Sequence, residues 1–162
     1  MARNSDLADF GSSASAGAVL QTVFNTHSSE SSFSNNTPTA IAGLTQSITL
    51  KSANPYIYVI LAINSYTKAT NNTALGIRLE ANSDTALDIK LSDMLGYTAS
   101  TLTTSGSAVQ NYYHNLTNDA AGATITYTPK FYSAGNNSTV YINPNYTGGG
   151  QISQIILMEI AK

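Results

Sequence analysis

Hydrophobic and polar residues alternate along several short stretches of the chain, with the period of two that is typical of half-buried β-strands. The clearest case is residues 76–91, where we expect two strands joined by a turn at residues 82–84. The residues on the apolar side of these strands are Ile77, Leu79, Ala81, Leu87, Ile89 and Leu91. The pattern predicts that this side faces a core.

The same alternation predicts three further strands, at residues 47–51, 124–132 and 139–142. Residues 135–137 are the expected turn before the last of these strands. Pro129 has no backbone N–H, so it places its strand at a sheet edge or at a bulge. Helical spacing of apolar residues does not extend over a useful length, and residues 92–96 would form one turn of helix at most. Seven or eight strands with short turns indicate an all-β fold, an antiparallel jelly-roll-type β-sandwich.

Two expected strands break the alternation because they are apolar on both faces, at residues 56–63 and 152–160. A strand of an antiparallel sandwich meets the core with one face only, so the other face needs a second cover. Either another segment of the chain or another subunit supplies that cover, since a bare face would promote aggregation. We expect the last strand to lie at a subunit interface made by Ile152, Ile155, Ile156, Leu157, Met158 and Ile160.

The first 44 residues differ in composition from the rest of the chain. They contain serine-rich clusters and few large apolar residues, too few for this segment to fold alone. A disordered tail and an arm that orders on a partner both fit this composition, and we favour the arm. The expected organisation is an extended N-terminal arm at residues 1–44 followed by the sandwich at residues 45–162. The apolar anchors of the arm are Leu7, Phe10, Leu20, Val23 and Phe24.

Charged residues make up only 10% of the chain, with seven Lys and Arg against nine Asp and Glu. This balance leaves no basic field for nucleic acid and no polybasic patch for a membrane surface. No apolar run approaches the roughly 20 residues that a membrane-spanning helix needs. We therefore expect neither nucleic acid nor a membrane as a partner.

Residues with catalytic or metal-binding chemistry are sparse. The chain has two histidines, His27 and His114, no cysteine, and no serine in a Gly-x-Ser-x-Gly turn. The spacing of Asp84, Asp88 and Asp93 matches no calcium-binding loop. We expect no enzymatic activity, no cofactor and no bound metal ion.

The chain contains ten tyrosines. Among them, Tyr112, Tyr113 and Tyr146 are expected near strand ends or in loops. Such rings pack at the rim of a core, contact a neighbouring subunit or stack on a sugar. All three alternatives are open for these residues.

Three segments of the C-terminal part resemble structural proteins of tailed phages, especially those of cyanobacteria and marine bacteria. They are TITYTPKFYS at residues 124–133, TVYIN at 139–143 and QIILMEIAK at 154–162. The opening MARNSDLADF also resembles the start of fibre-like and decoration proteins. The resemblance implies a virion component without catalysis, and a jelly-roll homotrimer similar to tumour-necrosis-factor-like assemblies. In such assemblies the final strand lies close to the trimer axis.

Two virion roles compete under this resemblance. A capsid cement, or decoration, protein ties neighbouring capsomers together, whereas a tail-fibre, knob or adaptor protein mediates attachment or binds a receptor. The chain has no coiled-coil heptads and no repeated shaft, which favours a cement protein on the outer capsid surface, made in the host cytoplasm. Its arm would then bind the major capsid protein or another virion protein. A dimer in place of the trimer, and a carbohydrate-binding module in place of a virion protein, are the remaining alternatives.

Overall fold

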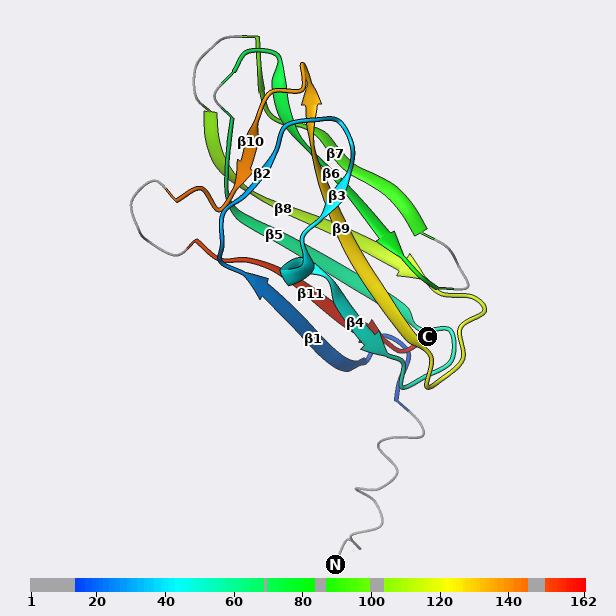
Figure 1. The fold of residues 1–162 in the computed structure, drawn as a ribbon. Coiled ribbons are helices and arrows are strands. Elements are labelled where there is room, and N and C mark those ends of the chain that lie inside the picture. Colours follow the sequence, from blue (N-terminus) through cyan, green and yellow to red (C-terminus); the bar gives the residue numbers. More distant parts are fainter. Residues whose placement is uncertain (1–13, 69, 84–86, 100–103, 146–150) are drawn as a thin grey trace, which may run out of the picture.

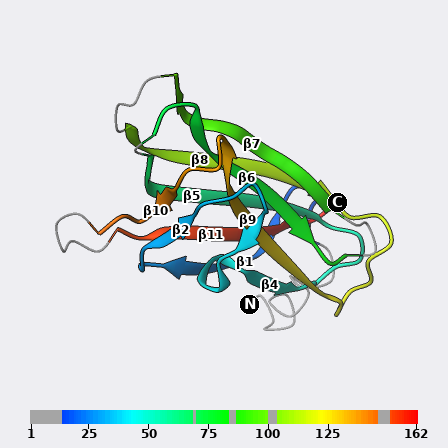
Figure 2. The same cartoon turned by 45° about the horizontal axis from the view of Figure 1, so that its top comes forward.

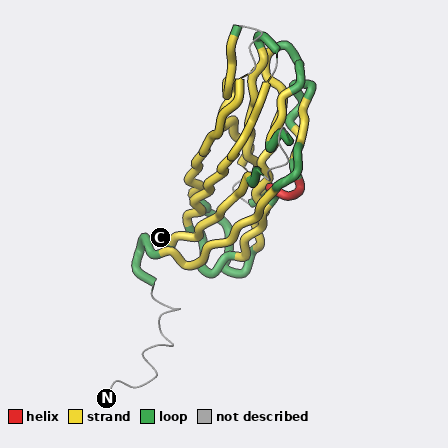
Figure 3. The backbone as a smooth tube through the Cα atoms, turned by 90° about the vertical axis from the view of Figure 1, so that its left-hand side faces the viewer, coloured by secondary structure: helices red, strands yellow, loops and turns green. Residues whose placement is uncertain are grey.

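The protein is described by a computed structural model that covers residues 14–68, 70–83, 87–99, 104–145 and 151–162. These residues form two antiparallel sheets that pack against each other (Figure 1). In the described residues the one helical element is a single 3₁₀ turn, Ala42–Leu44, at the side of the sandwich (Figure 3). The expected all-β, jelly-roll-type sandwich is confirmed.

The first sheet has six strands. They are β1 (Val19–His27), β2 (Ser31–Phe33), β5 (Tyr56–Lys68), β8 (Thr104–Asn115), β10 (Val140–Ile142) and β11 (Ser153–Ile160). The long strand β5 is central: β8 pairs with one of its edges, and β11 and β10 pair with successive parts of the other. β1 then pairs with β11, and β2 pairs with β10.

The second sheet has five strands. They are β3 (Thr39–Ala40), β4 (Gln46–Thr49), β6 (Thr73–Ala81), β7 (Leu87–Thr98) and β9 (Thr124–Gly135). β9 pairs with β6 on one edge and with β3 and β4 on the other, and β7 follows β6 (Figure 2). The expected place of Pro129 at a sheet edge is wrong, because β9 is paired on both sides. Pro129 lies where the pairing of β9 changes from β4 to β3.

The core lies between the two sheets and consists of the apolar sides that the alternation predicts. Ile77 and Leu79 of β6 are fully buried, and they face Ile57, Val59 and Leu61 of β5 across the core. Each such side chain contributes about 1.5–3 kcal/mol when it is buried. The local two-residue period therefore identifies the core-facing positions correctly in these strands.

Four strands of the described residues were not predicted: β1, β2, β3 and β8. Residues 92–96 continue β7, which agrees with the expectation of one helical turn at most. Register shifts in the pairing of β7 with β6 account for the weak alternation of these residues. Strand β8 has few apolar residues, among them Ala108 and Tyr112, which pack against the core. Its sequence therefore has no strong period of two.

The expected boundary between an arm and the sandwich at residue 45 is corrected for the described residues. β1 pairs with β11 from Val19 to His27, and Phe33 and Leu44 are buried in the core. The apolar residues of this segment are too few to form a core of their own, but they complete a core built by strands much later in the chain. Residues 1–13 lie outside the described residues.

Candidate self-association face

The outward side of the six-stranded sheet carries a continuous set of apolar side chains, which we call the apolar face. Its members are Val19, Phe24, Tyr56, Tyr58, Ile60, Val109, Tyr113, Ile152, Ile156, Met158 and Ile160. Strand register places all of them except Ile152, which precedes β11, in rows across β1, β11, β5 and β8. One row runs from Phe24 through Ile156 to Ile60. The next runs from Met158 through Tyr58 to Tyr113.

Several members of the apolar face are strongly exposed. Among the described residues, seven large hydrophobic side chains are exposed, and five of them lie on this face. Phe24 is 66% exposed, Val109 60% and Tyr113 49%. Contiguous exposed apolar patches on folded proteins mark interaction sites, because a bare patch of this kind is prone to aggregate.

An aromatic pair stands at one end of the apolar face. The rings of Tyr56 and Tyr113 lie with their centroids 4.7 Å apart, and Lys162 Nζ lies 5.0 Å from the centroid of the Tyr56 ring. Desolvation, with a smaller effect of Tyr56, raises the pKa of Tyr113 above its usual value. Neutral, rigid aromatic side chains of this kind are enriched at protein interfaces.

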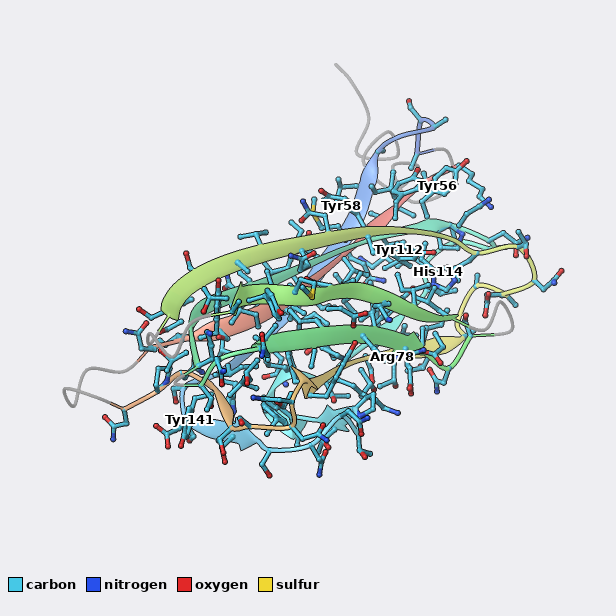
Figure 4. All side chains as sticks on the ribbon, turned by 90° about the horizontal axis from the view of Figure 1, so that it is seen from above. Tyr56, Tyr58, Arg78, Tyr112, His114 and Tyr141 are labelled. Carbon is cyan, nitrogen blue, oxygen red and sulfur yellow. The ribbon has the colours of Figure 1, made fainter. Side chains whose placement is uncertain are left out.

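Charged side chains are segregated from this face. In the part of the chain that the structure describes, the outward positions of β1, β5, β8 and β11 carry no Asp, Glu, Lys or Arg. Figure 4 shows Tyr56 and Tyr58 on one side of the molecule and Arg78 on the other. Strands without charge at their outward positions meet a second copy without like-charge repulsion, and the Lys162 ammonium lies at one end of the face, beside Tyr56.

The predicted interface residues of the last strand divide into two groups. Ile152, Ile156, Met158 and Ile160 lie on the apolar face. Ile155 and Leu157 are fully buried against their own core, which corrects their expected place in a subunit interface. Successive side chains of β11 point to opposite sides of the sheet, and the second sheet covers one of these sides. Ile155 and Leu157 therefore lie in the core, whereas Ile156 and Met158 point outward.

The five predicted arm residues are likewise separated. Phe24 belongs to the apolar face, and Val23, on the other side of β1, packs against the core. Leu20 is half-buried at a register shift at the start of β1. Their expected place in an extended arm is therefore corrected, because β1 is an integral strand of the sheet. Leu7 and Phe10 lie outside the described residues.

The three tyrosines that were singled out do not form one site. Tyr112 is half-buried against the core, whereas its neighbour Tyr113 points outward on the apolar face. Tyr146 lies outside the described residues. Sequence reasoning missed Tyr58, Ile60 and Val109, although the apolar character of residues 56–63 on both sides was a usable signal for the first two.

His114 has a structural partner. Its Nδ1 lies 2.8 Å from the Tyr127 hydroxyl oxygen, and both side chains are buried. Burial, with smaller effects of Asp119 and Tyr112, raises the pKa of Tyr127 far above its usual value, so its hydroxyl keeps its proton. In the described residues, no group of three or more His, Cys, Asp or Glu side chains is placed to hold a metal ion. None of the described helical segments is long and apolar enough to span a bilayer.

No protein-family model matches the chain, and a search of curated proteins found no significant match. Among solved structures, the chain is similar to that of infectious bursal disease virus Gx strain, with a TM-score of 0.45 and 13% identity over 88% of this chain and 37% of that chain. It is also similar to the globular domain of zebrafish complement 1qA protein, with a TM-score of 0.44 and 9% identity over 87% of this chain and 97% of that chain. The chain thus spans little more than a third of the viral chain. At these TM-scores and identities, neither likeness bears on function.

Proposed function

We propose that the chain is a self-associating structural protein of a virion. The observation that carries the proposal is the apolar face, whose four strands carry no charged residue at their outward positions and whose exposed members include Phe24 and Val109. The resemblance of residues 124–133, 139–143 and 154–162 to tailed-phage structural proteins supports the virion setting. Enzymatic activity is not part of the proposal.

The proposed assembly is a homotrimer in which each copy covers the apolar face of another around a common axis. Burial of apolar surface contributes roughly 25 cal/mol per Å², and a stable interface buries about 800 Å² on each partner. Phe24, Tyr58 and Tyr113 would contribute the largest side chains to such a contact. A dimer is the alternative assembly, and the two differ in sedimentation.

Within a virion, the proposed role is that of a cement protein on the outer capsid surface, attached to the major capsid protein or another virion protein. The residues proposed for attachment are Leu7 and Phe10 in residues 1–13. Gly17 N donates to Ala161 O at 2.8 Å, and Ala161 N donates to Ala18 O at 2.9 Å. Gly17 and Ala18 therefore lie beside the C-terminal strand.

Sedimentation of charged variants tests the self-association. Phe24→Asp and Val109→Asp each replace an exposed apolar side chain by a carboxylate. Because both positions are largely exposed in the single copy, each variant is expected to fold. Because the carboxylate would be buried in the assembly, each variant is expected to sediment as one 17.0 kDa chain. Met94→Asp is the matched control, because Met94 is 58% exposed but lies on β7 of the other sheet. The unmodified protein and this control are expected to sediment as trimers. An unmodified protein that sediments as a single copy at micromolar concentration would overturn the proposal.

Co-sedimentation with empty heads tests the attachment. A chain that lacks residues 1–13 is expected to remain a trimer and to lose head binding. Binding that persists in this deletion would remove the N-terminal segment from the mechanism. Labelling of the protein in intact virions separates the cement role from the tail-fibre or adaptor role, since the label falls on the shell in one case and on the tail in the other.

A further inference from the structure

The outward side of the five-stranded sheet, which we call the polar face, has the opposite chemistry. All three ion pairs found among the described residues lie on it. Arg78 pairs with Asp88 at 2.7 Å, Lys130 pairs with Glu80 at 2.6 Å, and Lys90 pairs with Asp93. The register of β6 with β7 and β9 places Arg78 between Lys90 and Lys130, and Glu80 opposite Asp88.

Two shallow depressions flank this ladder of ion pairs. The first has a volume of about 450 Å³, and its lining includes Glu80, Asn82, Asp88, Thr126 and Thr128. The second has a volume of about 440 Å³, and its lining includes Arg78, Lys90, Asp93, Met94 and Tyr132. Both volumes fall within the roughly 300–1,000 Å³ typical of sites for small ligands.

The first depression presents hydrogen-bonding groups suited to hydroxyls. Asp88 uses only Oδ1 to accept both bonds from Arg78, and its side chain is 56% exposed. Glu80 uses only Oε1 in its pair with Lys130. The Thr126 hydroxyl lies 2.7 Å from the Ser47 hydroxyl, so Thr128 supplies the hydroxyl that can both donate to a ligand and accept from it.

The balance of charge indicates a neutral ligand. Three cationic and three anionic side chains compensate one another within the ladder, so these six side chains carry no net charge that would favour an anion or a cation. A polyhydroxyl ligand adds hydrogen bonds without breaking an ion pair. Pairs of neighbouring hydroxyls also fit the two-pronged geometry of carboxylate and guanidinium groups.

The second depression adds an apolar contact and a rigid floor. Met94, which lines it, and Tyr97, on the same strand, are the two exposed large hydrophobic side chains of the described residues that lie outside the apolar face. The Tyr97 hydroxyl donates to Asn72 Oδ1 at 3.0 Å, which holds its ring in place. The Tyr132 ring lies against Gly76, where an added Cβ would come within 2.3 Å of it. A pre-organised surface of this kind lowers the entropy cost of binding.

From these observations we propose that the polar face binds a neutral saccharide, with Asp88, Glu80 and Thr128 as hydrogen-bonding groups and the Met94 region as the apolar contact. The proposal goes beyond the virion role and does not depend on the oligomeric state. It places saccharide binding on the sheet opposite Tyr113. Self-association of the apolar face would leave the polar face directed outward.

The test is a titration of the ¹⁵N-labelled full chain with chitotriose, maltotriose or mannotriose. The measured quantity is the change in the amide chemical shifts, recorded by NMR. We expect at least one of these saccharides to shift amides of β6, β7 and β9 at millimolar concentration. Thr128→Val is expected to weaken that binding about three- to tenfold, the cost of one or two hydrogen bonds. Thr124→Val is the matched control on the same strand, and it is expected to bind like the unmodified chain because Thr124 pairs with Thr49, away from the depression.

Three results would overturn the inference: no shift on these strands with any of the three saccharides, shifts produced only by inorganic phosphate or a sulfated saccharide, and shifts centred on Tyr113. Equal binding by the Thr128→Val and Thr124→Val variants would remove the first depression from the site. None of these results bears on the proposed self-association, because sedimentation of the Phe24→Asp variant tests that separately.

Discussion

Glu159 offers a sharp test of what holds the ends of the sandwich together. Its carboxylate is fully buried. It accepts hydrogen bonds from the backbone N–H of Lys51 at 3.0 Å and of Ser52 at 2.9 Å, from the Ser52 hydroxyl at 3.0 Å, and from Gln21 Nε2 at 2.5 Å. One side chain of β11 thus joins β1 to the segment that follows β4.

The expected cost of removing this carboxylate follows from those contacts. Hydrogen bonds to a charged group contribute about 1.5–3 kcal/mol each, and donors that are left buried without a partner add a further penalty. We expect Glu159→Ala to lower the free energy of unfolding by about 3–5 kcal/mol, because two backbone N–H groups, the Ser52 hydroxyl and the Gln21 amide all lose their acceptor. Glu159→Gln keeps the shape but replaces one accepting oxygen by a donor, so we expect a loss of about 2–3 kcal/mol.

Urea unfolding measures this cost, with the free energy extrapolated to zero denaturant. Since self-association would add to apparent stability, each variant is made in the Phe24→Asp background. Glu80→Gln is the control, because its pair with Lys130 is partly exposed and contributes at most about 1 kcal/mol. If Glu159→Gln costs no more than this control, the carboxylate does not hold the two segments in place and the reasoning is refuted.

Three further predictions concern turns and titrating groups. Gly135→Ala is expected to lower the melting temperature strongly, because Gly135 has φ +94 and an added Cβ would lie 1.9 Å from the backbone oxygen of Asn72; an unchanged melting temperature would contradict this. Burial, and then the hydrogen bond to Asp93, raises the pKa of Tyr132 to about 12 from 10.0, so stability that is present below pH 10 should be lost as the pH rises towards 12, and Tyr132→Phe should abolish this loss. Desolvation opposes the charged form of Asp93, but hydrogen bonds from Lys90 and Tyr132 outweigh it and lower the pKa of Asp93 below 3.8. The stability that Asp93 contributes should therefore be present above pH 3.8 and lost as the pH falls through its folded-state pKa. Unfolding measured across acid pH should show this loss in the unmodified chain and not in Asp93→Asn.

The two outward faces divide the surface of the sandwich by chemistry. The apolar face carries exposed Phe24 and Val109 without charge, whereas the polar face carries the ion-paired Arg78 and Asp88. Substitutions on one face should leave the other unaffected, because the core between them is closely packed and the two faces share no side chain. Variants of Phe24 and of Thr128 therefore separate assembly from ligand binding.

The period of two along the chain was enough to identify the strands that bury one side. Ile77 and Leu79, and likewise Ile125 and Phe131, are core residues as the alternation predicts. The apolar character of the last strand on both sides was also visible in the sequence. These properties are local, because successive side chains of an extended backbone point in opposite directions whatever the strand pairs with.

The alternation does not predict which strands pair with one another. Nothing local indicates that Phe24, assigned to an arm, lies opposite Ile156 in the last strand, or that Tyr58 lies between Met158 and Tyr113. The burial of Glu159 depends in the same way on Lys51 and Ser52, which are more than 100 residues away along the chain. The sequence by itself determined which sides of the strands are apolar. Only the tertiary structure decided which apolar sides close the core and which remain outside as a shared face, because register and pairing depend on contacts between segments distant in the chain.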